Sequence, residues 1–509
     1  MATTSEKKRI TKIIVIALIV FVVLAAAGVV LGTVYSNYVA NGGSERSTIS
    51  FESDHYKVNN CMYTYFNYTG IYNYGAYLSM MGVDPTQPLS SQDCSYMQAD
   101  ENGNQGTWHQ YFIQQSANEI MTYLNYAEAA RAADFEYADI EKDIDSQIEV
   151  LKGKATEAGY ENLQDYLDAY YASFVKESDV RDALKLQLFA NKYYTKAEDD
   201  IKAELTESDY DTKLNDNPNS LKKVDFMSYS ISADVAEDAD EAATQVANQA
   251  AEARAKELLA AAATKEAFTE WVKADLTEKN ATAETPSTEE EIKEQAESVT
   301  EGQAYSEGDD FSTWAFDANR AVGEATMLDD GNGTYTVYFL IKTPYLEEYE
   351  TKNVRHILLK SEEDNETIEA KAKEILDEFK AGDKSEDAFD ALAKEHNEDT
   401  ASLYKNVTKG QMVEEFNDWI FNDQRKAGDT DIVKTQYGYH IMYFAGNGLK
   451  AWQAEAQSNL TSDKMTETTT KWQEDHKVDY EINAIYQIPD TIPTAAAASM
   501  ASTDGVTVG

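Results

Sequence analysis

The sequence has little cysteine and few basic residues. Its 509 residues include 2 cysteines and 6 histidines, and 44 lysines and arginines stand against 91 aspartates and glutamates, for a net charge of -47. Because such a surface repels phosphate backbones, we expect no binding of nucleic acid. Neither cysteine has a histidine at the spacing of a metal ligand, so the sequence predicts no metal site, and no cofactor is expected.

Cys61 and Cys94 are a candidate disulfide. Outside a membrane two thiols can oxidise, and closing a loop of about 33 residues would stabilise the fold by roughly 3 kcal/mol if the geometry allows it. The alternative is that both are small, buried, unpaired residues. The sequence leaves both interpretations open.

An apolar run near the N-terminus predicts a membrane segment. Residues 13–34 are almost all apolar, follow four basic residues, and exceed the roughly 20 residues that span a bilayer. The basic residues predict a single-pass anchor in the cell membrane, with a cytoplasmic N-terminus and the bulk of the chain outside the cytoplasm. A cleaved signal peptide is the alternative, because residues 25–27 are alanines, but the apolar run continues beyond them.

The rest of the chain divides into a helical half and an α+β half. Helical periodicity dominates up to about residue 222, with a stripe of tyrosines, Tyr65, Tyr68 and Tyr72, that we interpret as packed core. Strands and helices alternate beyond it. The predicted parts are a cytoplasmic tip and transmembrane anchor at 1–35, a linker at 36–51, a helical domain at 52–222, two α+β repeats at 223–346 and 350–446, an acidic, mobile insertion at 275–310 in the first repeat, a C-terminal helical segment at 447–489 and a disordered tail at 490–509.

The α+β half carries one pattern twice. FSTWAF at 311–316 is matched by FNDWIF at 416–421, and a strand, two helices, this aromatic motif and a closing strand recur in the same order. The residues matched at fixed offsets are Phe311 and Phe416, Trp314 and Trp419, Phe316 and Phe421, Arg320 and Arg425, and Gly323 and Gly428. Such agreement predicts a duplicated domain, and about 100 residues suit one small α+β unit.

The two copies differ in their histidines. The second copy has His356 on its first strand and His440 on its last, whereas the first copy has Phe226 near the former position and Thr336 at the latter. A lone histidine on a strand is usually a half-buried polar residue with one partner. Two on the paired strands of one repeat, both absent from its sibling, favour a functional site. The first copy is predicted to be a degenerate scaffold or peptide-binding surface.

Three stretches mark the second copy: NVRHILLK, GQMVEEFNDWIF and GDTDIVKTQYGYHIMYF. In this order they resemble the parvulin family of peptidyl-prolyl cis/trans isomerases, over about residues 350–446. The resemblance implies that His356 and His440 lie next to each other in the core of a catalytic site.

The same resemblance assigns the other candidate site residues. Gln411, Met412 and Phe416 come from the GQM-x-x-x-F motif, which contributes to substrate binding and lines the proline pocket in the family. A Cys, Asp or Thr follows the second helix in family members. Here the loop HNEDTAS offers Asp399 or Thr400 as the catalytic partner of the histidines.

One stretch departs from the family pattern. Members usually carry a GGDLGW-like stretch before GQM, whereas this chain reads LYKNVTKGQM, shorter and without those glycines. We expect Leu403 or Tyr404 to supply the inner wall of the cleft instead. The departure keeps open the alternative that the domain is inactive and the protein is a holdase chaperone.

The order of the parts resembles the PrsA-like and SurA-like extracytoplasmic foldases. In these a helical module, helped by the C-terminal segment, holds unfolded clients. The resemblance implies a membrane-anchored isomerase and chaperone that acts on unfolded or partly folded exported polypeptides and their X-Pro segments. A surface adhesion or structural protein that uses both repeats as binding modules is a third alternative.

The implied reaction needs no covalent step. Rotation about an X-Pro amide faces a barrier of about 18–20 kcal/mol, because the C–N bond has partial double-bond character. A catalyst must bind the twisted amide better than either planar form. Met412 and Phe416, four residues apart, would face the same way on a helical turn and hold the proline ring. His356 and His440, hydrogen bonded to each other and to Thr400, would form a fixed polar floor rather than transfer protons.

Overall fold

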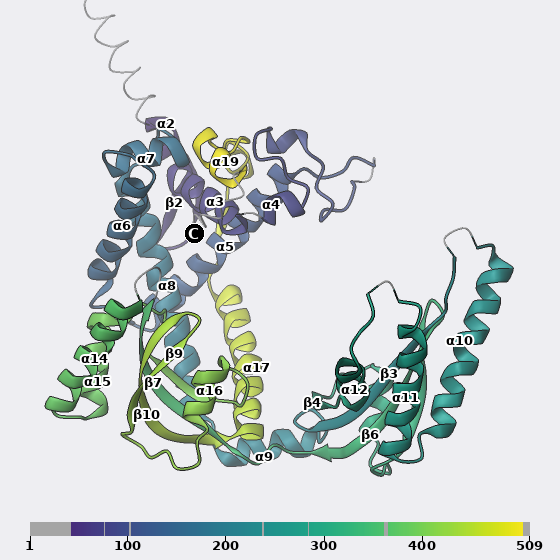
Figure 1. Ribbon diagram of the computed structural model, residues 1–509. Helices are drawn as coiled ribbons and strands as arrows, with labels where there is room; N and C mark the ends of the chain where they lie inside the picture. The colour runs from purple at the N-terminus through teal and green to yellow at the C-terminus, as the bar shows by residue number, and fades with distance from the viewer. Residues whose placement is uncertain are drawn as a thin grey trace, which may run out of the picture. The chain divides into compact units, whose positions relative to one another are not determined.

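The computed structural model describes residues 42–75, 77–100, 103–236, 239–283, 285–360 and 365–501, which divide into two compact units (Figure 1). One unit comprises the chain up to Ala203 together with the residues from Asp463 onward, and the other comprises Glu204–Ser462. The predicted anchor at 13–34 lies outside the described residues. Within the described ranges, no helix is long and apolar enough to cross a membrane.

The first unit is mainly helical. Its helices are α2 (Gly43–Ser47), α3 (Asn60–Tyr74), α4 (Tyr77–Met80), the short 3-10 helix η1 (Leu89–Ser91), α5 (Trp108–Ala132), α6 (Ile140–Glu157), α7 (Leu163–Tyr170), α8 (Glu177–Glu204), α18 (Ile482–Ile485) and α19 (Thr494–Ala501). A small antiparallel sheet accompanies them, in the order β11 (Asp479–Tyr480), β1 (Ile49–Glu52) and β2 (Lys57–Asn59).

The two long helices of the core, α3 and α5, begin at side-chain caps. Asn59 accepts a hydrogen bond from a backbone N–H of the first turn of α3, and Thr107 forms a capping box with Gln110 at the start of α5. The tyrosine stripe on α3 is packed core, as predicted. Its buried phenols find hydrogen-bond partners, and the Tyr68 hydroxyl donates to the Thr491 carbonyl at 2.7 Å.

Two expectations about this unit are wrong. Residues 43–51 are not linker, because they contain α2 and most of β1. Residues 490–501 are not a disordered tail, since they contain α19. Ile485, Ile488 and Ile492 lead into this helix and are buried in the core that α3 and α5 share. Tertiary packing orders this segment, which composition alone does not reveal; residues 502–509 lie outside the described residues.

The candidate disulfide does not form in this structure. Cys61 and Cys94 are both free thiols, and both are buried. Burial, and then the nearby Asp179 carboxylate, raise the pKa of the Cys61 thiol to about 12, so this thiol is protonated at neutral pH. Of the two interpretations left open, the structure agrees with small, buried, unpaired residues.

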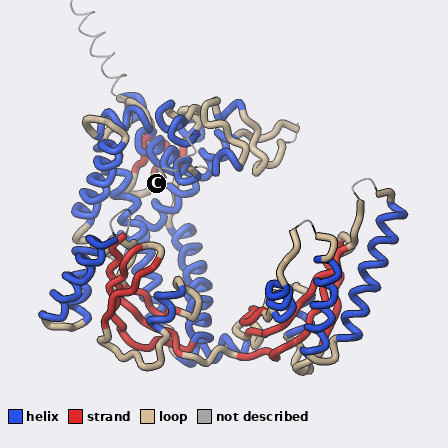
Figure 2. The backbone as a smooth tube through the Cα atoms, in the orientation of Figure 1, coloured by secondary structure: helices blue, strands red, loops and turns tan. Residues whose placement is uncertain are grey.

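The second unit holds two antiparallel four-stranded sheets, one in each repeat (Figure 2). The strands of the first are β3 (Lys223–Ser232), β4 (Thr300–Ala304), β5 (Ala325–Gly331) and β6 (Thr334–Tyr345), and those of the second are β7 (Glu350–Lys360), β8 (Leu403–Val407), β9 (Thr430–Thr435) and β10 (Gly438–Lys450). Their orders are β4-β3-β6-β5 and β8-β7-β10-β9. Strands that correspond in sequence therefore occupy the same place in the two sheets, as a duplicated domain requires.

Helices flank these strands. They are α9 (Glu207–Asp216), α10 (Glu241–Ala261), α11 (Lys265–Asn280), α12 (Glu289–Glu297), α13 (Asp310–Ala315), α14 (Asn365–Ala381), α15 (Glu386–His396), α16 (Glu414–Ile420) and α17 (Ala451–Asp475), the last of which continues into the first unit. In the second repeat, Ile357 and Ile441 pack with the residues of α14 and α15 on one face of the sheet. Val354 and Met442 pack with α16 on the other (Figure 1).

The acidic insertion of the first repeat is largely folded. α12 begins at a capping box of Thr288 and Glu291, and it buries Ile292 and Ala296. β4 then pairs with β3 at the edge of the sheet. The expectation of a mobile segment at 275–310 is therefore wrong for these elements, because two apolar residues suffice to fix a short, well-capped helix against the repeat.

The arginines that recur in both repeats have one structural role. The Arg425 guanidinium lies 3.9 Å from the centre of the Trp419 ring, and its Nε donates to the Trp419 carbonyl at 3.2 Å. Arg320 and Trp314 form the same pair, at 5.3 Å and 3.1 Å. Each arginine stabilises the end of its aromatic helix, which explains the fixed spacing in sequence.

Candidate active site

The central strands of the second repeat bring two histidines together. In the ladder, His356 of β7 pairs with Met442 of β10, and His440 pairs with Leu358, so the histidines are diagonal neighbours. Because side chains alternate along a strand, both lie on the face that carries α16. They are 2% and 5% exposed, so both rings are buried.

The imidazoles belong to one chain of hydrogen bonds. His356 Nδ1 lies 3.0 Å from His440 Nδ1, with the rings stacked at 14°. His356 Nε2 lies 3.0 Å from the Ala401 carbonyl and 3.2 Å from Asp399 Oδ2. At the other end, His440 Nε2 lies 2.9 Å from Thr435 Oγ1. This chain of hydrogen bonds therefore runs from the loop after α15, through both imidazole rings, to the end of β9.

The chemistry of the partners fixes where each proton sits. A carbonyl only accepts, so His356 Nε2 donates to Ala401 and Nδ1 of the neutral ring accepts. His440 Nδ1 must then donate to His356, which leaves His440 Nε2 as an acceptor for the Thr435 hydroxyl. The Tyr437 backbone N–H donates in turn to Thr435 Oγ1 at 3.1 Å. All donors in the chain point the same way.

The electrostatics keep both rings neutral. Burial lowers the pKa of His356, against the opposing effects of the Ala401 carbonyl and Asp399. Burial, and then the neighbouring His356, lower the pKa of His440 to about 4. Although burial raises the pKa of Asp399, hydrogen bonds from the Thr400 N–H and the Tyr404 hydroxyl, with the two histidines, lower it below its usual value. A neutral imidazole pair beside an ionised carboxylate is the state near neutral pH.

An apolar wall faces the histidine pair. The Phe416 ring is 2% exposed, and its centre lies 5.6 Å from that of His356 and 5.4 Å from that of His440, edge to face with both. Met412 is half-buried against the same cluster. It precedes α16, whose N-cap is Val413, so the expectation that Met412 and Phe416 share a helical turn is wrong, although they line one wall.

The loop residues separate into one that joins the network and one that does not. Asp399 faces His356, as given above. Thr400 is exposed, and its backbone N–H donates to Asp399 Oδ1 at 2.8 Å, while no hydrogen bond of its hydroxyl reaches a histidine within the described part of the chain. The hydroxyl beside the imidazoles comes from Thr435, which sequence reasoning missed. A signal existed, because Thr435 stands five residues before His440 across a tight hairpin.

The remaining candidates also differ. Tyr404, from the stretch that departs from the family pattern, donates its hydroxyl to Asp399 Oδ2 at 3.1 Å, and its ring centre lies 5.3 Å from that of His356. Gln411 is exposed and accepts hydrogen bonds from the backbone N–H and hydroxyl of Thr408, at 3.0 Å and 3.3 Å. Tyr404 therefore belongs to the site, and Gln411 fixes the turn before α16.

The first repeat has different residues at the matching positions. The Gly323 N–H donates to the Leu340 carbonyl, and the Gly428 N–H donates in the same way to the Phe444 carbonyl. Aligning the closing strands of the two repeats on these equivalent hydrogen bonds places Thr336 at the position of His440. The strand register then places Ser228, which pairs with Tyr338, at the position of His356. The approximate assignment of Phe226 to that position is wrong by two residues, because pairing with the closing strand sets the register.

In the first repeat, aromatic rings rather than imidazoles contact the counterpart of Phe416. The ring centres of Phe226 and Tyr338 each lie 4.4 Å from that of Phe311, the counterpart of Phe416. The Thr336 hydroxyl lies 2.7 Å from Ser230 Oγ and donates to Asp330, which stands at the position of Thr435. Within the described ranges no group of three or more His, Cys, Asp or Glu side chains is placed to hold a metal ion.

Comparisons with known proteins agree with this geometry. Residues 338–446 match the protein family described as the PPIC-type PPIASE domain. The foldase protein PrsA of Exiguobacterium sibiricum is 39% identical over 101 residues, covering 19% of this chain and 29% of that protein. The foldase protein PrsA 1 of Listeria innocua is 32% identical over 145 residues, covering 26% of this chain and 46% of that protein. The chain thus matches less than half the length of these curated relatives.

The likeness to solved structures is weak. The crystal structure of PrsA from Bacillus subtilis is 15% identical and covers 81% of this chain and 93% of that chain, with a TM-score of 0.25. The resemblance of the second repeat to the parvulin-type isomerases is confirmed by the family match, and residues 338–446 contain a PPIC-type PPIase domain.

Proposed function

We propose that the second repeat is an active peptidyl-prolyl cis/trans isomerase and that the chain is a foldase and chaperone for exported proteins. The observation that carries the proposal is the directed hydrogen-bond chain through His356 and His440, buried directly against Phe416. A buried polar network is expensive to maintain unless it is fully satisfied, and this one is satisfied at both ends.

The proposed site works by fixed geometry. Phe416 and Met412 hold the proline ring by apolar contact, so that binding energy fixes one side of the amide. His356 and His440 form a floor whose dipoles are already oriented, because their neighbours set each proton. Asp399 and Tyr404 form the polar rim beside His356. The X-Pro carbonyl turns against this surface with no bond made or broken and no proton transferred.

The remaining parts of the proposal concern clients and location. Relatives named as foldases suggest unfolded or partly folded exported polypeptides, and their X-Pro segments, as the substrates. The apolar run at 13–34 is proposed to hold the chain in the cell membrane, with the two units outside the cytoplasm. The helical unit is proposed as the part that holds clients.

A refolding assay tests the proposal. The client is a protein whose refolding is limited by one X-Pro isomerisation, which takes tens to hundreds of seconds without a catalyst. The full chain is expected to accelerate this phase, whereas the double variant His356→Ala/His440→Ala should not accelerate it but should still suppress client aggregation. Absence of acceleration by the parent chain would favour a holdase, and absence of both effects would leave only a structural role.

A further inference from the structure

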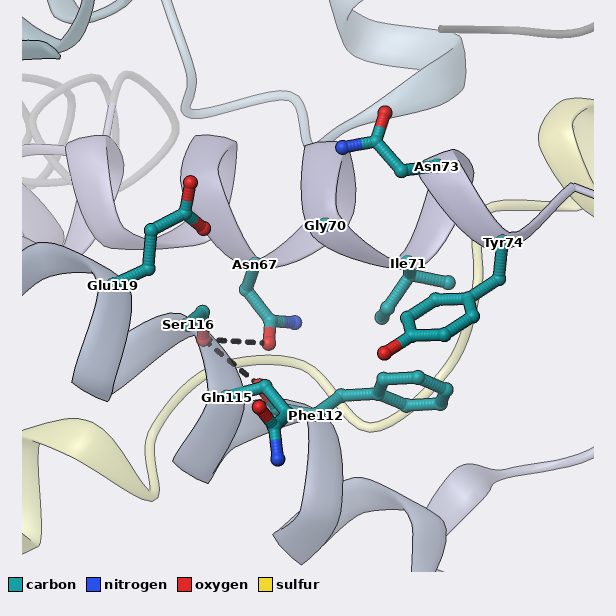
Figure 3. Close-up of a pocket in the computed structure, with 9 residues that line it drawn as sticks. All are labelled: Asn67, Gly70, Ile71, Asn73, Tyr74, Phe112, Gln115, Ser116 and Glu119. Carbon is teal, nitrogen blue, oxygen red and sulfur yellow. Dashed lines mark hydrogen bonds between the residues drawn. The ribbon is translucent and has the colours of Figure 1, made fainter. Parts of the chain in front are cut away.

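The first unit contains a pocket of about 300 Å³ between α3 and α5 (Figure 3). This volume is at the lower end of the range for ligand pockets, about 300–1,000 Å³. It lies in the helical unit and shares no residue with the site of the second repeat. Three features of its lining point to an occupant.

The first feature is a side-chain amide that faces the pocket. Asn67 is 2% exposed, and its side-chain carbonyl accepts from the Ser116 hydroxyl at 3.1 Å. Among the described residues no acceptor reaches its amide nitrogen, which points into the pocket in Figure 3. A carbonyl group bound in the pocket would accept a hydrogen bond from this nitrogen in place of water.

The second feature is a glycine in the interior of a helix. Gly70 lies inside α3, where glycine is a poorer helix former than alanine. A Cβ added at Gly70 would meet no atom within 4 Å, so packing of the chain itself does not require glycine here. Because glycine has no side chain, a bound molecule can instead approach the backbone of α3 closely at this wall of the pocket.

The third feature is the contrast between the two ends of the pocket. Ile71, Tyr74 and Phe112 form an apolar end, and Glu119 stands at the other, with Asn67 between them (Figure 3). The Glu119 carboxylate accepts from the Tyr123 hydroxyl at 2.5 Å, and among the described residues no lysine, arginine or histidine pairs with it. It is therefore available to a cation, and the net charge of -47 favours one.

We propose that this pocket binds an extended segment of unfolded polypeptide that carries a basic residue close to an aromatic or aliphatic one. The backbone carbonyl of the segment accepts from Asn67, its basic side chain pairs with Glu119, and its apolar side chain packs on Ile71 and Phe112. Recognition through a backbone carbonyl tolerates many sequences, as a chaperone needs. The inference rests on the proposed chaperone function, and names the class of segment that the helical unit selects.

Binding of a labelled peptide tests the pocket. The probe is a fluorescein-labelled, proline-free peptide with one arginine and one tryptophan separated by one residue, and the measurement is fluorescence anisotropy with the full chain at fixed salt. Gly70→Leu is expected to weaken binding at least tenfold by filling the pocket, and Gly70→Ala by no more than about threefold. Leucine is the better helix former, so circular dichroism and thermal unfolding should show an intact fold.

A second variant keeps the test independent of folding. Glu119→Gln preserves an acceptor for Tyr123 and should weaken binding of the arginine peptide, but not of the same peptide with citrulline in place of arginine. Unchanged affinity in Gly70→Leu, or an equal loss for both peptides in Glu119→Gln, would overturn the proposal. A dimer of the parent chain that Gly70→Leu dissociates would also overturn it, because the pocket would then be a contact between two copies of the chain. Because the peptide lacks proline and turnover is not measured, failure here is distinct from failure of the isomerase.

Discussion

The two repeats place Phe311 and Phe416 at the same position over the same kind of sheet, and they differ in what lies beneath. Under Phe416 are two buried imidazoles joined at 3.0 Å. Under Phe311 are the rings of Phe226 and Tyr338. The first arrangement places a polar floor with fixed donors beside the phenylalanine, and the second places aromatic rings beside it. The two repeats therefore share a strand order, and a few side chains determine which groups lie beneath the phenylalanine.

The first repeat retains a remnant of the polar network. Thr336 donates to Asp330, at the positions of His440 and Thr435. In both repeats a side-chain hydrogen bond joins the two strands of the last hairpin, through different residues. Because Ser228 and Thr336 do not titrate near neutral pH, this repeat is also insensitive to the protonation that affects the second.

The largest expected effect comes from removing the aromatic ring of each repeat. Phe416→Ala and Phe311→Ala should each lower the free energy of unfolding by about 3–4 kcal/mol, because both delete a buried ring. Only Phe416→Ala should abolish turnover of a proline peptide at a temperature where both variants are folded. Denaturant titration and a turnover assay measure the two effects, and a loss of turnover in Phe311→Ala would break the comparison.

Protonation should destabilise only the second repeat. Folded His440 has a pKa near 4, below its ordinary value of about 6.5, so the unfolded chain binds the proton first as the pH falls. The contribution to stability is complete above about pH 6.5 and is lost towards pH 4, by on the order of 3 kcal/mol. Unfolding free energies of the parent and His440→Gln between pH 4 and 7 should show the steeper slope in the parent. Parallel curves would mean that the imidazole is not held neutral.

The smallest expected effect on turnover distinguishes the roles of Thr435 and Thr400. Thr435→Val removes the hydroxyl that donates to His440 Nε2 and keeps the shape of the side chain, so turnover should fall about tenfold, which corresponds to roughly 1.4 kcal/mol. Thr400→Val, at an exposed residue, should change turnover less than twofold. The measurement is the turnover rate of a proline peptide by each purified variant. A larger loss of turnover in Thr400→Val than in Thr435→Val would show that Thr400, and not Thr435, supports the histidine pair.

The sequence predicts the features that depend on local pattern. His356 and His440 stand out as two histidines on the paired strands of one repeat, the resemblance to the parvulin family adds Phe416, and these residues do come together. Thr435 was missed although it stands five residues before His440, because its role becomes apparent only when the hairpin that turns β9 back onto β10 is recognised. Asp399 and Thr400 are adjacent in sequence, and only the backbone hydrogen bond from Thr400 to Asp399 determines which of them faces the ring.

Register and long-range packing account for the other errors. Ser228, not Phe226, matches His356, because pairing with the closing strand rather than the spacing within one strand sets the alignment. Ile492 and the alanines of α19 lie in a stretch of low complexity, so composition predicted a disordered tail from residue 490. Their burial against α3 and α5 involves residues several hundred positions earlier in the chain, a contact that local composition does not encode.

The central claim is that the chain has one isomerase site, built on the neutral histidine pair of the second repeat. Its most direct test is turnover of a short proline peptide by the full chain carrying His440→Ala, with the first repeat unchanged. The rate is predicted to fall at least tenfold, because His356 loses its donor and the floor beneath Phe416 loses its order. Turnover equal to that of the parent would contradict the claim.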